Sequence, residues 1–166
     1  MNKNIEFEFL LGKPVSKFSE TIGNDFENKL FKNNFYYIPD DTSKKNFCEM
    51  DYNCLSILTD EIDNVQSITI HFREIISIHS YNLLIKKYGK PNNILIAENK
   101  QVISESISED VDFRQHLTKS NFDLKEGTFE ENPLYIIWLK ENYQIKAFLR
   151  YKQKTSEITF SVLTKN

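Results

Sequence analysis

The strongest constraint on this chain is the strict alternation of apolar and polar residues near its C-terminus. Every second residue from 143 to 151 is apolar, and the alternation returns from 158 to 162. A period of two is that of a β-strand with one buried face. An apolar segment at 134–139 comes first, and polar residues at 140–142 and 152–156 supply the turns. The pattern predicts a three-stranded antiparallel meander.

Shorter segments elsewhere also have the composition and length of strands. They are residues 5–9, 35–38, 54–59, 65–72 and 94–96. The third and fourth of these flank a short acidic turn, which predicts an antiparallel hairpin.

Two segments show the spacing of an amphipathic helix. Residues 80–88 place apolar side chains at i, i+3, i+4 and i+7. Ser80 is a candidate N-cap, and Gly89 is typical of the residue that follows a helix end. In residues 16–31 apolar side chains recur every four positions. This spacing predicts a second helix, which Gly23 weakens.

These elements predict the fold class. Of the 166 residues, 40% are hydrophobic, which is enough for a packed core. The chain lacks the repeated strand-helix crossovers of a parallel sheet. We expect one α+β domain over residues 1–166, with a single antiparallel sheet of about six to seven strands. Two to three helices pack on one face, and the meander lies at the C-terminal end.

Residues 98–132 are highly charged and have no clear pattern. Ser-Ile-Ser-Glu at 106–109 has the form of a capping box, which predicts a helix from about 107 to 118. A segment this long without regular structure is often functional. We therefore expect a mobile or inserted segment that contacts a partner. Its expected partner-binding residues are acidic: Glu109, Asp110, Asp112, Glu126, Glu130 and Glu131.

The sequence lacks familiar catalytic and cofactor motifs. With four glycines, the chain has no phosphate-binding loop and no dinucleotide fingerprint. Cys48 and Cys54 do not have zinc-site spacing, so we expect no metal and no cofactor. His71, His79 and His116 lie outside catalytic motifs. A triad assembled in three dimensions stays open, because triads are recognised by geometry rather than by sequence order.

Charge and hydropathy narrow the classes of partner. The formal net charge is −3, whereas proteins that track nucleic acid are usually basic. No apolar run approaches the roughly 20 residues of a membrane-spanning helix. The N-terminal residues do not read as a secretory signal, because Glu6 and Glu8 interrupt the apolar positions. We expect a cytoplasmic protein that binds neither nucleic acid nor a membrane.

The helix end Tyr88-Gly89-Lys90-Pro91 and Trp138 in the first strand of the meander carry a resemblance. Over residues 54–162 the chain resembles small bacterial α+β proteins in which a helix ends in Tyr-Gly-x-Pro before terminal strands. Such proteins include immunity proteins of bacterial toxin systems and inhibitor-like binding domains. The resemblance implies a protein-binding role rather than catalysis, and it assigns no functional residue.

The first functional hypothesis is therefore a non-catalytic protein-binding module, such as an immunity-type inhibitor of a bacterial toxin. Complementary charge would speed the association of an acidic inhibitor with a basic enzyme. The alternatives are a small hydrolase-like enzyme with a dispersed site that pairs a histidine with a carboxylate, and a carrier of a small ligand. The enzyme would need a pocket in which His71 or His116 faces a carboxylate.

Overall fold

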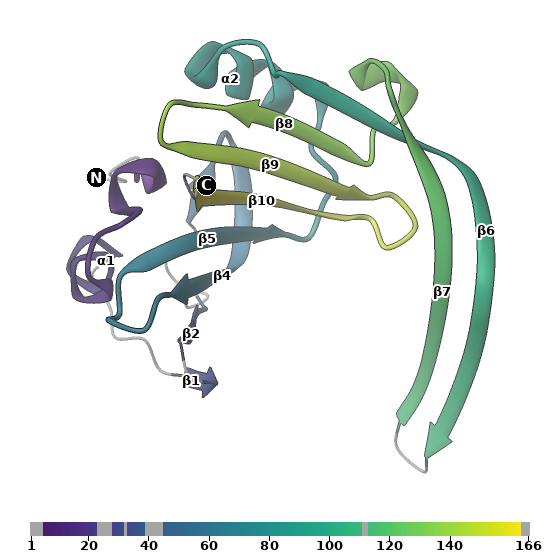
Figure 1. Cartoon of the computed structure of the whole chain (residues 1–166), viewed down its shortest axis with the longest axis horizontal. Coiled ribbons are helices and arrows are strands. Elements are labelled where there is room, and N and C mark those ends of the chain that lie inside the picture. Colours follow the sequence, from purple (N-terminus) through teal and green to yellow (C-terminus); the bar gives the residue numbers. More distant parts are fainter. Residues whose placement is uncertain (1–4, 23–27, 32, 39–44, 111–112, 164–166) are drawn as a thin grey trace.

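The computed structural model describes residues 5–22, 28–31, 33–38, 45–110 and 113–163. Within these residues, nine strands form a continuous antiparallel sheet in the order β1-β2-β4-β5-β10-β9-β8-β6-β7, and β3 pairs with β4 (Figure 1). The strands are β1 (Asn28–Phe31), β2 (Asn34–Tyr37), β3 (Asn46–Phe47), β4 (Met50–Thr59), β5 (Val65–Phe72), β6 (Asn93–Asp110), β7 (Phe113–Glu126), β8 (Tyr135–Leu139), β9 (Tyr143–Arg150) and β10 (Thr155–Val162). The helices are α1 (Val15–Ile22) and α2 (Ile78–Tyr88), with short 3-10 turns η1 (Phe7–Leu10) and η2 (Phe129–Glu131).

The C-terminal meander forms as its alternation predicts. β8 pairs with β9, and β9 pairs with β10. Ile145, Ala147 and Leu149 of β9 are fully buried, and so are Ile158 and Phe160 of β10. These strands therefore direct every second side chain into a core on one face of the sheet. The predicted hairpin is also confirmed, since β4 pairs with β5.

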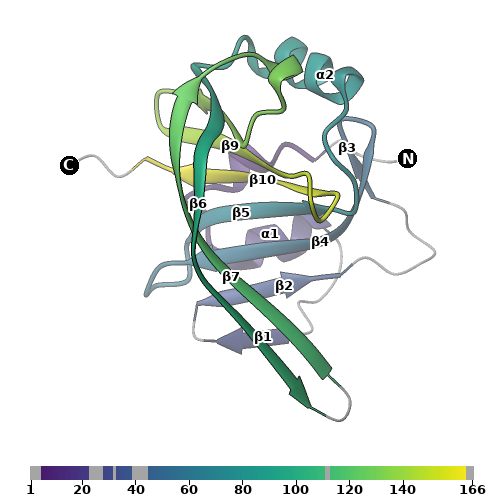
Figure 2. The same ribbon diagram turned by 90° about the vertical axis from the view of Figure 1, so that its right-hand side faces the viewer.

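Helices and 3-10 turns cover this buried face of the sheet. Phe18 of α1 and Leu84 of α2 are fully buried in the same core cluster. Phe7 of η1 packs edge-on against Phe47, with ring centroids 5.7 Å apart. In Figure 2, α1 lies behind the sheet, on the side away from the viewer. The opposite face of the sheet is therefore left without a helical layer among the described residues.

Helix α2 begins two residues before its predicted start. Its N-cap is Ser77, whose side chain accepts a hydrogen bond from the backbone N–H of Ser80. Ser80, the predicted N-cap, instead lies buried inside the first turn. Gly89 ends the helix at φ 80°, as expected, and its carbonyl accepts a 2.8 Å hydrogen bond from the Trp138 indole. This bond ties the helix end to β8.

Two predictions for the N-terminal part of the chain are wrong. Residues 5–9 do not form a strand, because the chain coils as η1 and buries Phe7 and Leu10, three residues apart, while Phe9 is 68% exposed. The helix predicted over 16–31 ends at Ile22, and residues 28–31 form β1. Gly23 lies outside the described residues.

The fold class holds as an antiparallel α+β arrangement, but the sheet has more strands than the six to seven expected. The additional strands lie mainly at its two ends. One is β1, where a helix had been predicted. The other is β7, where the capping-box pattern had indicated a helix over 107–118.

That second helix is replaced by β6 and β7, which pair as a long hairpin. The capping-box signal is local, and the three serines between 102 and 109 have low helix propensity. Pairing the two segments gives the inward-facing backbone groups of each strand a partner along the hairpin. Among the described residues, no helix is long and apolar enough to span a lipid bilayer.

Candidate binding surface

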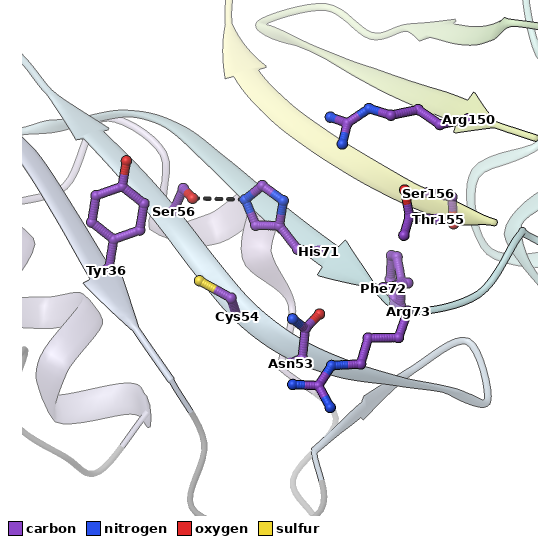
Figure 3. A pocket seen from close by; sticks show the side chains of 10 residues that line it. All are labelled: Tyr36, Asn53, Cys54, Ser56, His71, Phe72, Arg73, Arg150, Thr155 and Ser156. Carbon is purple, nitrogen blue, oxygen red and sulfur yellow. Dashed lines mark hydrogen bonds between the residues drawn. The ribbon is translucent and has the colours of Figure 1, made fainter. Parts of the chain in front are cut away.

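The face of the sheet opposite the core, here called the open face, carries polar and aromatic side chains. Ser56, His71, Phe148 and Glu157 lie on it, each between buried neighbours along its strand, and Tyr36 joins them as the register partner of Ser56. A shallow hollow of about 420 Å³ lies on this side of the sheet (Figure 3). Its lining residues are Tyr36, Asn53, Cys54, Ser56, His71, Phe72, Arg73, Arg150, Thr155 and Ser156.

A chain of polar contacts crosses four strands beside the hollow. The Ser56 hydroxyl lies 2.7 Å from Nε2 of His71. On the other side of the ring, Nδ1 lies 3.4 Å from Oε2 of Glu157. Arg150 donates to the same carboxylate oxygen at 2.5 Å. Antiparallel register creates this arrangement, because Glu157 of β10 lies directly opposite His71 of β5.

These contacts stabilise the ionised form of Glu157. The hydrogen bond from His71 and the positive charge of Arg150 lower the pKa of its carboxyl, although partial burial opposes the shift. Burial has the opposite effect on the neighbouring thiol, since it raises the pKa of Cys54. Cys54 is therefore a protonated thiol near neutral pH and a poor nucleophile.

Ser56 contacts His71 and His71 contacts Glu157, in the same way as the nucleophile, the general base and the carboxylate of a catalytic triad. Such a triad also needs N–H donors aimed at the developing oxyanion. Ser56 lies inside β4 with β2 on one side and β5 on the other, opposite Tyr36 and Thr69. The sheet ladder therefore engages the backbone groups that often form an oxyanion hole.

Aromatic and cationic side chains alternate across β8 and β9 on the open face. The rings of Tyr135 and Phe148 stack with centroids 5.0 Å apart. Lys146 lies over Tyr135 at 5.5 Å from the ring centroid, and Arg150 lies over Phe148 at 4.8 Å. These contacts give this part of the open face an apolar surface with positive charge above it.

Beyond the sheet, β6 and β7 continue together as a two-stranded arm, defined here as residues 97–124. β6 pairs with β8 from Asn93 to Leu95, and from there it pairs with β7 alone among the described strands. Figure 1 shows the arm leaving the edge of the sheet and bending past it. In Figure 2 it crosses in front of the sheet, on the side opposite α1.

Two irregularities in the pairing account for the bend. Between Glu98 and Gln101, and again between Val102 and Ser104, β6 has one more residue than β7. Asn99, in the first of these bulges, has φ 51°, and its side chain donates to Asp123 at 3.0 Å. Bulges bend a strand and increase its twist. Figure 1 shows the longer strand, β6, on the outer side of the arm.

The two faces of the arm differ in character. Cross-strand partners share a face, so Leu124 lies with its partner Ala97, and Val102 lies with Ser120. Alternation along β7 places Phe122 on this same face, and Ile107 joins it opposite position 116. We call Val102, Ile107, Phe122 and Leu124 the apolar face; they are 58%, 56%, 39% and 45% exposed.

The other face, called the polar face, is held together by charged and amide groups. Lys125 forms an ion pair with Glu98 near the base of the arm. Leu117, which is 56% exposed, lies on the polar face opposite Ser106. Ile103, which is 53% exposed, lies in the second bulge, where the pairing assigns it to neither face.

The apolar face is continuous with the open face of the sheet. Leu95 lies opposite Tyr135 of β8 and also opposite Glu126 of β7. Because partners in register share a face, the side of the sheet that carries Tyr135 continues along the arm through Ala97 and Leu124. One surface therefore runs from the hollow to the arm.

Of the six acidic residues expected to bind a partner, the structure describes five, and these are spread along the arm and its base. Glu109 is exposed near the far end of β6, and Asp110 ends that strand. Asp112 lies outside the described residues. Glu126 ends β7 and accepts a hydrogen bond from Asn93. Glu130 and Glu131 lie in η2, where Glu131 accepts hydrogen bonds from the backbone and hydroxyl of Thr128.

The three histidines lie apart. His71 is at the hollow, while the exposed His79 of α2 pairs with Glu49 at 2.7 Å. His116 belongs to β7, and its side chain is outside the description. Sequence reasoning singled out His71 but missed Ser56, Arg150 and Glu157, which are non-local in sequence. The period-two pattern of β4, β9 and β10 was the available signal, since it places these residues on the outward face.

Comparison with known proteins adds no relative: no family model, no curated protein and no solved structure matches this chain.

Proposed function

We propose that this chain is a non-catalytic protein-binding module whose contact surface is the apolar face of the arm together with the open face. The exposed apolar face carries the proposal. Four large apolar side chains on one side of a thin ribbon mark an interaction site, because soluble proteins rarely leave such a patch uncovered. A two-stranded ribbon is also only marginally stable by itself in water. A partner that covered the apolar face would stabilise the arm.

The acidic residues of the arm would speed its association with a basic partner. The arm contains six acidic and three basic residues, so it carries a net charge of −3. Charge of this kind steers an encounter with a basic partner and acts less on the final affinity. An immunity-type inhibitor that covers a basic toxin enzyme would use the arm in this way. The inhibitor role rests on the resemblance to bacterial immunity proteins, and it goes beyond the proposal of a protein-binding module.

The test is photo-cross-linking in cells that produce the chain. A photoreactive amino acid replaces Ile107 on the apolar face in one variant and Leu117 on the polar face in another. The two positions are matched, since each side chain is 56% exposed. We expect a discrete adduct with another polypeptide from position 107 and little from position 117. Equal labelling from both positions, or none from position 107, contradicts the proposal.

One observation favours a second function, hydrolysis of an activated ester or amide. It is the Ser56–His71–Glu157 chain of contacts, with Ser56 and His71 both lining the hollow. In this reading Ser56 attacks the acyl carbon, His71 accepts the hydroxyl proton and Glu157 stabilises the imidazolium. The bond to the leaving group then breaks, and the leaving group departs with that proton. Water, deprotonated by His71, attacks the acyl-enzyme, releases the acid and restores Ser56.

An ester with a good leaving group, p-nitrophenyl acetate, tests this second function. An active site predicts hydrolysis that Ser56→Ala abolishes, whereas Ser67→Ala, in the neighbouring strand β5, leaves it intact. Equal rates for the wild type and Ser56→Ala would exclude catalysis by Ser56 and leave the contacts with a structural role.

A further inference from the structure

We infer that the partner of the binding surface is a second copy of this chain, with the arm of each copy lying across the open face of the other. The inference rests on the proposed function and names its partner. It predicts a symmetric dimer in which the same two surfaces meet twice, as in two-fold interfaces generally.

The arm has the length needed to cross the open face. Residues 97–110 of β6 would extend about 45 Å at about 3.3 Å per residue. The open face from β8 to β2 contains six strands, which span about 25 Å at about 4.8 Å per strand spacing. An arm from a second copy could therefore reach from the aromatic pair on β8 and β9 to the hollow on β4 and β5.

The area of contact favours two copies over a single arm bound to an unlike surface. A two-stranded ribbon about 10 Å wide that crosses about 25 Å of open face covers roughly 250 Å², so one docked arm removes roughly 500 Å² from water. Stable interfaces bury about 1,200–2,000 Å². Reciprocal docking of two arms buries roughly 1,000 Å², just below this range and in keeping with a weak, reversible dimer, whereas a single arm buries half as much.

The chemistry of the two surfaces is complementary. The arm carries a net charge of −3, while the rest of the chain has equal numbers of acidic and basic residues. On the open face Arg150 pairs with Glu157, Arg73 lines the hollow and Lys146 lies over the ring of Tyr135. The apolar face of the arm would meet the stacked rings of Tyr135 and Phe148. This chain therefore presents both halves of such an interface.

The test is the mass of the purified, reduced full-length chain, measured by light scattering and sedimentation equilibrium. We expect twice the 19.7 kDa of one copy at about 100 µM, since an interface of about 1,000 Å² is at the weak end of specific association. The double variant Ile107→Thr, Phe122→Thr removes apolar contacts while keeping residues that suit a strand. Its dissociation constant should rise on the order of 100-fold, because the dimer loses each contact twice.

The matched control is Leu117→Thr on the polar face, which should remain dimeric. Cross-linking a mixture of isotope-labelled and unlabelled chains through position 107 then identifies the contact. Adducts between labelled and unlabelled copies, at residues of the open face, support reciprocal docking. A monomeric wild type, or a double variant as dimeric as Leu117→Thr, overturns it. An arm folded onto its own sheet gives a monomer and counts against the dimer as well.

The two proposals fail separately. A monomeric purified chain that still forms a position-107 adduct with a different polypeptide in cells refutes the dimer and leaves the binding module standing. A chain that is monomeric and also forms no such adduct removes both.

Discussion

Glu157 is the residue on which the polar network of the open face converges. It receives contacts from β5 through His71 and from β9 through Arg150, while it belongs to β10. Both contacts favour its ionised form. A folded-state pKa below the ordinary value of 4.5 means that the unfolded chain binds a proton more readily. The stability from this group is therefore present above pH 4.5 and is lost as the pH falls through the lower, folded-state pKa.

The change Glu157→Gln tests this account. At pH 7 the free energy of unfolding of this variant should be about 1–2 kcal/mol lower than that of the wild type, because the variant loses two charge-assisted hydrogen bonds at a partly exposed site. The difference from the wild type should shrink as the pH is lowered below 4.5. Urea unfolding at a series of pH values measures both effects.

Glu61→Gln makes the same change of charge in the exposed turn between β4 and β5, and it should leave stability nearly unchanged. A difference between Glu157→Gln and the wild type that stays constant from pH 7 to pH 3 would show that ionisation of Glu157 does not contribute.

At the scale of elements, the arm is separate from the packed interior. Every residue in the buried core lies outside residues 97–124. The arm joins the sheet through the first residues of β6, where Leu95 pairs with Tyr135. The stability of the molecule therefore comes from the sheet and its covered face, and the arm contributes its own ladder of backbone hydrogen bonds.

Replacing residues 98–123 by Asn-Gly should leave the rest of the chain folded. Ala97 and Leu124 are partners in the ladder, so a two-residue turn can close the hairpin between them. We expect cooperative urea unfolding with a free energy within about 1 kcal/mol of the wild type, because no core residue is removed. Far-UV circular dichroism follows the transition. A broad, non-cooperative transition would mean that the core depends on the arm.

Elements also differ in how far local sequence determines them. The helix over 78–88 was predictable because its apolar spacing and Gly89 act within one or two turns. Its N-cap was misplaced because Ser77 and Ser80 are both suitable residues, and the choice depends on how Ile76 and Tyr81 are buried. The predicted helix over 107–118 failed for a related reason. A capping motif cannot outweigh a complete ladder with a second strand.

At the scale of the whole molecule, the arm and the open face differ in charge. The arm holds the net negative charge, and the open face holds the cationic and aromatic side chains. Figures 1 and 2 show the arm beside the open face, away from the helical layer. This division makes a binding surface out of two regions that are far apart in the sequence.

The sequence by itself determined the strands of the meander, the hairpin of β4 and β5, the body of α2 and the acidic character of the arm. These features depend on neighbours within a few residues, and periodicity or composition reports them directly. The tertiary structure alone decided that positions 56, 71 and 157 meet, and that Tyr135 shares a face with Leu124. Those contacts depend on the pairing of β5 with β10 and of β6 with β8. Strand order is set by the total burial that a whole sheet achieves, and no local pattern encodes it.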